Sequence, residues 1–199
     1  MSEILIVIHS THGNTLAMGR EVARGVEQVD GASARLRAVG PLTSAVDPER
    51  QPPPDDGPAL VDNRDLAECD GLILGSPTRF GNMASAMKHF LDGTGGEWFS
   101  GTLTGKPAGV FTSTSTLHGG QESTLLSMMI PLLHHGMILV GLPYSEKALT
   151  STRSGGTPYG PSHLAGPDSD RALDDDERSL CRALGRRVAT IAGQLGSDS

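Results

Sequence analysis

Hydroxyl and amide side chains directly follow the first apolar run of the chain. That run, residues 4–8, has the β-branched composition of a strand buried on both faces. The polar loop that follows consists of Ser10, Thr11, His12, Gly13, Asn14 and Thr15. Before a helix, such a loop aims hydroxyls and backbone N–H groups at one spot, where the helix dipole is positive. The pattern indicates a phosphate-binding loop; an ordinary strand-to-helix turn is the competing interpretation.

Two more loops with suggestive chemistry follow later apolar runs. In the first of them, Thr78, Arg79 and Phe80 precede Gly81. An aromatic residue beside a glycine lets the backbone approach a flat ligand closely, and Arg79 adds a permanent positive charge. The other loop holds Ser113, Thr114, Ser115, Thr116, Leu117, His118 and Gly119. The competing interpretations are a tight turn with a solvated arginine and a flexible polar loop that caps the next helix.

Strand and helix patterns alternate along the chain and must position these loops. We predict strands at residues 3–9, 34–39, 70–77, 108–113 and 137–140, and helices at 13–29, 60–67, 83–91, 121–135 and 174–195. Alternation predicts an α/β fold, a doubly wound parallel sheet with helices on both faces. Ligands of such sheets bind beyond the carboxyl ends of the strands, so the three loops should converge.

The remaining segments show no break that would mark a second domain. Residues 40–57 are rich in proline and are predicted to form a long surface loop, and residues 151–166 a glycine-rich excursion. Pro131 lies inside a predicted helix and should bend it. We therefore expect one domain over residues 1–199.

Composition excludes several classes of function. Sixteen basic against 23 acidic residues give a net charge of −7, which argues against nucleic acid or an anionic membrane surface as a partner. No apolar stretch is long enough to span a membrane. Cys69 and Cys181 lie far apart, as expected for two reduced, buried thiols. Rossmann, P-loop and nucleophile-elbow motifs are absent, and we expect no metal site.

Two further residues are candidates for contact with a ligand. Trp98 is the single tryptophan and lies between glycine-rich turns, where it could stack against a ligand or be a half-buried packing residue. His134 ends a predicted helix, where the dipole favours an imidazolium, and it could equally be a capping residue.

Five motifs occur in an order that resembles the WrbA family of flavodoxin-like NAD(P)H:quinone oxidoreductases. They are Pro77-Thr78-Arg79-Phe80-Gly81-Asn82-Met83; Phe90-Leu91-Asp92 with Thr94-Gly95-Gly96 and Trp98; Gly119-Gly120-Gln121-Glu122; His134-His135-Gly136-Met137; and Gly155-Gly156-Thr157-Pro158-Tyr159-Gly160. The loop at residues 10–15 also matches the Ser/Thr-x-x-Gly-Asn/Ser-Thr pattern of flavodoxin-like proteins. The resemblance covers nearly the whole chain.

The resemblance implies a fold, a cofactor and an activity. The fold would be flavodoxin-like, a five-stranded parallel sheet of order 2-1-3-4-5. The protein would be a cytoplasmic homotetramer that binds FMN and contributes to the response to oxidative stress. It would use NADH or NADPH to reduce quinones by two electrons in a ping-pong mechanism.

The resemblance also assigns roles by matching position. FMN phosphate would bind at residues 10–15, and the flavin ring at Thr78, Arg79, Phe80 and residues 113–119. His134 would contact the flavin and act in catalysis by donating a hydrogen bond to the quinone oxygen, and Trp98 would flank the substrate. His12 stands where some members have a tyrosine that touches the nicotinamide nucleotide.

Two other functions remain open. A flavodoxin-like carrier would pass single electrons to protein partners, but the segments around Trp98 and residues 157–159 would crowd an exposed flavin edge. A transcription-linked interaction protein, which the family's name suggests, fits poorly with the acidic charge balance.

Overall fold

A parallel sheet forms the centre of the protein. The structure is a computed structural model, and it describes residues 1–40, 42 and 57–196. The main path of the sheet has the order β2-β1-β3-β5-β6. These strands span Ala32–Ala38, Ser2–Ile8, Gly71–Arg79, Pro107–Thr114 and Ile138–Leu139, respectively. This is the predicted order 2-1-3-4-5, so the flavodoxin-like fold class is confirmed.

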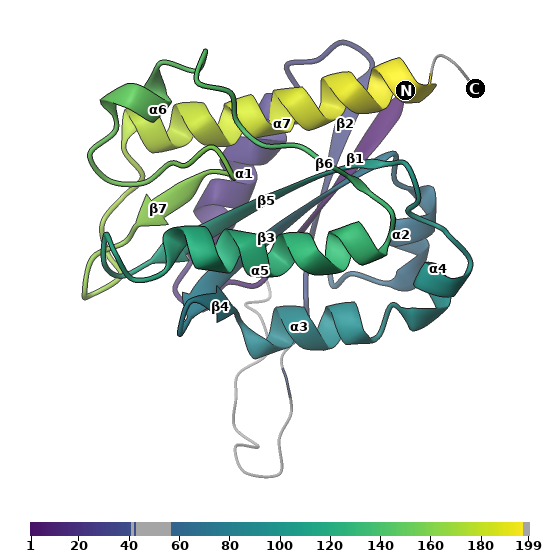
Figure 1. The fold of residues 1–199 in the computed structure, drawn as a ribbon, viewed down its shortest axis with the longest axis horizontal. Coiled ribbons are helices and arrows are strands. Elements are labelled where there is room, and N and C mark those ends of the chain that lie inside the picture. Colours follow the sequence, from purple (N-terminus) through teal and green to yellow (C-terminus); the bar gives the residue numbers. More distant parts are fainter. Residues whose placement is uncertain (41, 43–56, 197–199) are drawn as a thin grey trace.

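Helices cover both faces of the sheet (Figure 1). On one face lie α1 (Asn14–Val26) and α7 (Asp175–Gly196), and on the other α3 (Ser85–Asp92) and α5 (Gln121–His134). The remaining helices are short: α2 (Asn63–Glu68), α4 (Gly95–Phe99) and α6 (Ala148–Ser151). Side chains of β1 alternate between two apolar clusters, with Ile4 and Ile6 toward α1 and α7, and Leu5 and Val7 in the other cluster.

Two strands were not predicted. β4 (Asn82–Met83) pairs antiparallel with the end of β3, which moves the start of α3 to Ser85. β7 (Ser162–Leu164) pairs with the carboxyl end of β5, whereas β6 pairs with its beginning. Two short strands thus share one edge of β5. Three residues are too few to show a strand period, which is why the sequence did not reveal β7.

Several local predictions are refined by the structure. Trp98 lies on the short helix α4 rather than between turns, and α5 continues through Pro131 to His134. Cys69 and Cys181 are buried free thiols, as predicted. The proline-rich stretch predicted as a loop lies outside the described residues except for Gly40, Leu42 and Gly57. In the described part of the chain, no helix combines the length and apolarity needed to cross a membrane.

Two glycines let α1 and α7 cross in backbone contact. A Cβ atom on Gly185 would lie 2.1 Å from the carbonyl oxygen of Val22, and one on Gly25 would lie 2.1 Å from that of Arg182. Real Cβ atoms do not approach this closely, so any larger residue must push the helices apart. Because α1 begins in the loop at residues 10–15, this crossing also positions the candidate phosphate-binding loop.

We expect Gly185→Ala to lower the free energy of unfolding by about 3 kcal/mol, because the new methyl group overpacks a rigid backbone contact. Gly193→Ala is the matched control on the same helix, where the nearest atom, Ser2 Oγ, would lie 3.9 Å away. There, better helix propensity should stabilise by roughly 0.5–1 kcal/mol. Urea denaturation of both variants checks this, and equal effects would contradict the close crossing.

Candidate active site

The loops after β1, β3 and β5 meet around a hollow of about 210 Å³ at the carboxyl edge of the sheet. We call it the strand-end hollow. It is lined by Ser10, Thr11, His12, Asn14, Thr15, Pro77, Thr78, Arg79, Ser113, Thr114, Ser115, Ala165 and Ser169. The structure therefore brings together residues of all three loops that the sequence singled out.

The first loop is shaped to present donors to this hollow. Gly13 stands at the N-cap of α1 with φ = +85°, a left-handed conformation that favours glycine. Ser10 Oγ accepts a hydrogen bond from the backbone N–H of Leu16 at 3.3 Å, which folds the loop over the helix start. Because the first N–H groups of a helix have no partner within it, those of Asn14 and Thr15 are available to bind an anion at this position, whereas that of Leu16 already donates to Ser10.

Arg79 adds a positive charge at the same hollow. Its guanidinium donates hydrogen bonds to Thr11 Oγ1 at 3.2 Å and to the carbonyl oxygen of Thr78 at 2.8 Å. None of the lining residues is acidic. Hydroxyls, N–H groups and a guanidinium without a carboxylate are the donor set that suits a phosphate group, so the residues present fit the phosphate end of FMN.

The second and third loops are held against each other by glycines. A Cβ atom on Gly120 would lie 2.7 Å from Gly81 Cα. Beside this contact Phe80 has φ = +52°, and its side chain is fully exposed and does not line the hollow. A left-handed aromatic residue stores backbone strain, which is common at ligand sites.

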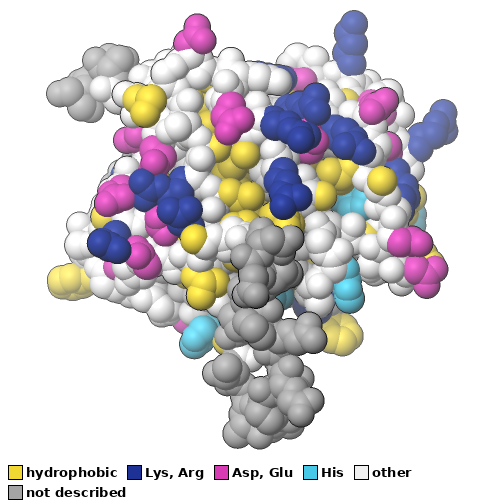
Figure 2. All heavy atoms as spheres, turned by 180° about the vertical axis from the view of Figure 1, so that it is seen from behind, with side chains coloured by type: hydrophobic (Ala, Val, Ile, Leu, Met, Phe, Trp, Pro, Cys, Tyr) yellow, Lys and Arg dark blue, Asp and Glu magenta, His cyan; other side chains and the backbone are white. Residues whose placement is uncertain are grey.

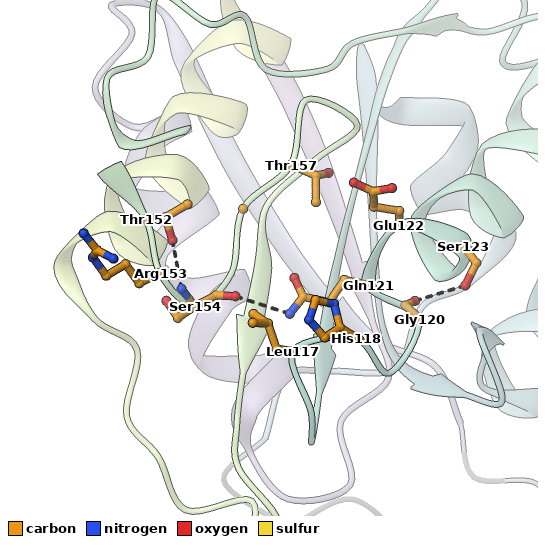
Figure 3. Close-up of a pocket in the computed structure, with 11 residues that line it drawn as sticks. Leu117, His118, Gly120, Gln121, Glu122, Ser123, Thr152, Arg153, Ser154 and Thr157 are labelled. Carbon is orange, nitrogen blue, oxygen red and sulfur yellow. Dashed lines mark hydrogen bonds between the residues drawn. The ribbon is translucent and has the colours of Figure 1, made fainter. Parts of the chain in front are cut away.

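Residues of the third loop line two different hollows. Ser113, Thr114 and Ser115 line the strand-end hollow, whereas Leu117 and His118 line a neighbouring one of about 530 Å³. Figure 3 shows His118 beside Gln121 in this second hollow, and Gln121 Nε2 donates to the carbonyl oxygen of Ser154 at 3.4 Å. Thr116 and Gly119 line neither of these two hollows.

Trp98 and His134 line the same hollow, which is not the strand-end hollow. They line a hollow of about 400 Å³, here called the helix-end hollow, with Lys88, Leu91, Asp92, Thr94, Gly95, Ile130, Pro131 and His135. His134 is the last of the 14 residues of α5, whose first residue, Gln121, follows the third loop. At about 1.5 Å per residue, the two ends of α5 are roughly 20 Å apart. The structure therefore separates Trp98 and His134 from the strand-end hollow of the same chain.

His135, the second histidine of the His134-His135 motif, is a buried residue of the helix-end hollow to which the sequence assigned no role in the site. Its side chain is hydrogen-bonded through Nε2 to Thr94 Oγ1 at 2.9 Å, and among the described residues its Nδ1 has no hydrogen-bond partner. Burial lowers the pKa of His135, with the charge of His134 acting in the same direction and that of Glu97 against it. The fold thus favours the neutral imidazole.

This pKa shift makes stability depend on pH. Because the folded-state pKa of His135 lies below its unfolded value, the contribution of His135 to stability is complete above about pH 6.5 and is lost as the pH falls through the folded pKa. Between pH 7 and pH 5 the free energy of unfolding of the wild-type protein should fall, and in His135→Gln it should fall less. His134→Gln is the control: burial, the larger cause of the shift, remains at His135, so this variant should retain most of the wild-type pH dependence in urea denaturation.

Ala165 and Ser169 also line the strand-end hollow, and sequence reasoning missed both. They follow β7, and their place depends on its pairing with β5. A long-range strand pair leaves no local signal in the sequence.

Comparison with known proteins agrees with this geometry. Residues 2–146 match the model of a family described as NADPH-dependent FMN reductase. A protein of Chromohalobacter salexigens named NAD(P)H dehydrogenase (quinone) is 44% identical, over 98% of this chain and 99% of its own length. A protein of the same name from Syntrophobacter fumaroxidans is 46% identical, over 97% and 98%.

Solved structures agree as well. A flavodoxin, WrbA-like protein from Agrobacterium tumefaciens superposes with a TM-score of 0.66 at 26% identity, over 98% of this chain and 99% of its own. A flavodoxin from the domain Archaea has a TM-score of 0.64 at 19% identity, over 96% and 99%, which supports the fold alone.

The sheet order and the anion-suited strand-end hollow define a flavodoxin-like protein. Within that class, the chain belongs to the NADPH-dependent FMN reductase family, which confirms the WrbA-type resemblance of its sequence.

Proposed function

We propose that this protein is an FMN-dependent NAD(P)H:quinone oxidoreductase that reduces quinones by two electrons in a ping-pong mechanism. The observation that carries the proposal is the meeting of the three predicted loops at a hollow with phosphate-binding chemistry. The name shared by the full-length relatives, NAD(P)H dehydrogenase (quinone), supports the activity.

The residues of the strand-end hollow would bind and orient the cofactor. Residues 10–15 hold the phosphate with hydroxyls and N–H groups. The resemblance places Arg79 at the ring, but its hydrogen bond to Thr11 favours a role at the phosphate, where it neutralises part of the charge. Thr78 and residues 113–115, which line the hollow, contact the ring; Phe80 and residues 116–119 lie outside this lining, and their contact with the ring stays a prediction of the resemblance. When bound there, FMN supplies the two-electron chemistry, with NADH or NADPH as donor and a quinone as acceptor.

A homotetramer would complete the site. Trp98 and His134 are far from the flavin position of their own chain, so in this proposal they reach the flavin of a neighbouring chain. Leu126, Ile130 and Leu133 recur along an exposed face of α5, and the exposed Trp98 and Phe99 lie on α4. Exposed apolar side chains of this kind favour burial between subunits.

The charge distribution fits small-molecule substrates better than nucleic acid. Lys and Arg side chains are interspersed with Asp and Glu on the face seen in Figure 2. With a net charge of −7, this supports the proposal that nucleic acid is not a partner. The two free thiols favour the cytoplasm as the compartment.

Anaerobic stopped-flow absorbance tests the activity. The FMN-loaded protein should lose its flavin absorbance on mixing with NADH or NADPH and regain it on mixing with benzoquinone. Steady-state double-reciprocal plots should be parallel, because nicotinamide and quinone occupy one place in turn. Failure to turn over any quinone, together with single-electron transfer to a protein acceptor, would favour the electron carrier instead.

A further inference from the structure

The segment between β7 and α7 forms one wall of the strand-end hollow. We call residues 165–174 the closing segment. Its Ala165 and Ser169 line the hollow. Asn14 Nδ2 donates to the carbonyl oxygen of Ser169 at 2.9 Å, and Ala165 N–H donates to that of Thr114 at 2.7 Å. The closing segment is therefore bonded to both the first and the third loop.

This segment is not held by its local sequence alone. Ser169 has φ = +57°, a conformation that costs a non-glycine residue energy and needs support from its surroundings. Gly166 also has a positive φ, +81°. Within the segment, the N–H of Ser169 donates to the carbonyl oxygen of Gly166 at 3.2 Å and that of Arg171 to Ala165 at 3.0 Å, and contacts with the rest of the fold add to these local bonds.

A fully buried carboxylate lies behind it. Glu177, near the start of α7, is 0% exposed. Its two oxygens accept hydrogen bonds from the backbone N–H groups of Leu164 at 3.0 Å and Asp174 at 3.0 Å. Leu164 directly precedes the closing segment and Asp174 is its last residue, so one carboxylate connects its two ends.

Two side chains add to this connection. His163, also 0% exposed, approaches Glu177 Oε2 through Nδ1 at 2.9 Å, and through Nε2 it donates to the carbonyl oxygen of Arg171 at 3.0 Å. The Arg171 guanidinium donates to the carbonyl oxygen of Leu164 at 2.7 Å, to Glu177 at 3.0 Å and to Asp174 at 2.6 Å. We call His163, Arg171, Asp174 and Glu177 the Glu177 cluster.

The electrostatics keep Glu177 ionised. Burial alone would raise its pKa, but hydrogen bonds from His163 and from the N–H groups of Leu164 and Asp174 outweigh it, so the pKa of Glu177 lies below its ordinary value. The Arg171 guanidinium, 3.0 Å from Glu177 Oε1, supplies a positive charge beside it.

A buried ion cluster of this kind is poor evidence for overall stability, because desolvation cancels much of the attraction. The neighbouring turns of α7 already pack on the sheet through buried apolar residues such as Leu180, Leu184 and Val188. What the cluster adds is a defined geometry for the closing segment.

We propose that the Glu177 cluster consists of positioning residues for the cofactor, which hold Ala165 and Ser169 against the first and third loops and so shape the wall of the FMN site. The inference rests on the proposed function in one respect, that FMN occupies the strand-end hollow. None of the four residues lines the hollow. They act through the backbone of the closing segment.

The test is the affinity for FMN, measured by quenching of flavin fluorescence, in Glu177→Gln. The amide keeps the shape of the side chain but lacks the charge and one acceptor oxygen. We expect the FMN dissociation constant to rise tenfold or more, and hydrogen exchange at Ala165 and Arg171 to accelerate. The kcat of the FMN-saturated enzyme should change by less than threefold, because no reacting group is removed.

Glu21→Gln is the matched control. Glu21 is buried on α1 and accepts from Arg182 of α7 at 2.7 Å, but it does not line the strand-end hollow. Its FMN dissociation constant should stay within twofold of wild type, whatever its melting temperature. If Glu177→Gln does not fold, Arg171→Lys replaces it, since a lysine keeps the charge but its compact ammonium cannot span the three acceptors that the planar guanidinium reaches.

The outcomes separate the inference from the proposed function. A wild-type chain that binds no FMN would overturn both. FMN binding in wild type that is unchanged in Glu177→Gln or Arg171→Lys would overturn the positioning role alone. So would a loss of affinity matched by Glu21→Gln at equal loss of stability, because the effect would then be general destabilisation.

Discussion

The purified protein should bind FMN at least about a hundredfold more tightly than riboflavin. Riboflavin has the same ring and ribityl chain but lacks the phosphate. In the strand-end hollow the phosphate would meet the N–H groups at the start of α1 and the hydroxyls of Ser10 and Thr11, with Arg79 beside them. Charge-assisted hydrogen bonds contribute roughly 1.5–3 kcal/mol each, and about 1.4 kcal/mol is tenfold in affinity, so two such bonds suffice.

Titrations of the apoprotein with both ligands in the same buffer measure this ratio. Arg79→Gln provides the control, because it should weaken FMN binding and leave riboflavin binding within about twofold. Raising the salt concentration should reduce the preference for FMN, since part of it is electrostatic. Equal affinities for the two flavins would mean that residues 10–15 do not bind the phosphate.

Loss of His134 should slow quinone reduction by up to about 10²–10³-fold, the cost of losing one donor to an oxygen that gains charge. The affinity for FMN should change little, since His134 lies at the other end of α5 from the phosphate loop. In stopped-flow experiments, reoxidation by benzoquinone should slow in His134→Ala, whereas reduction by NADH should be affected less. Unchanged reoxidation in a folded, FMN-loaded variant would leave His134 with a capping role only.

Mixed assemblies test whether His134 acts on a neighbouring chain. Thr11→Glu places a carboxylate at the anion-binding hollow and should abolish FMN binding. Co-expression of Thr11→Glu and His134→Ala should give more activity than the sum of the two variants alone, because one chain supplies FMN and the other supplies His134. No recovery in verified mixed assemblies would mean that each site is built from a single chain.

The sequence predicts those parts of the fold that have a strong local signal. Buried apolar runs mark β1 and β3, and their exits mark the loops that form the strand-end hollow. Gly13 is predicted as part of the first loop, but its left-handed conformation comes from the structure alone.

What the sequence does not reveal depends on long-range contacts. β7 has three residues and exists because β5 offers a free edge, so Ala165 and Ser169 enter the hollow without any local pattern. The distance between His134 and the first loop is likewise set by the direction of α5 across the sheet. The family resemblance assigns His134 and the loop at residues 10–15 to one site, but it does not say whether one chain or two chains supply them.

The two edges of the sheet have a consequence for how copies of this chain meet. A long, flat edge strand is a template for adding a strand from another molecule, the route to fibrous aggregates. Here the edge next to β5 is divided between β6 and β7, of two and three residues, and the opposite edge, β2, carries Arg35 and Arg37 in ion pairs with Glu3 and Asp65. Neither edge favours continuous pairing with a strand of another molecule. Association of this protein should therefore use contacts between helices and loops rather than strand pairing, and concentrated solutions should resist growth of β-rich fibrils.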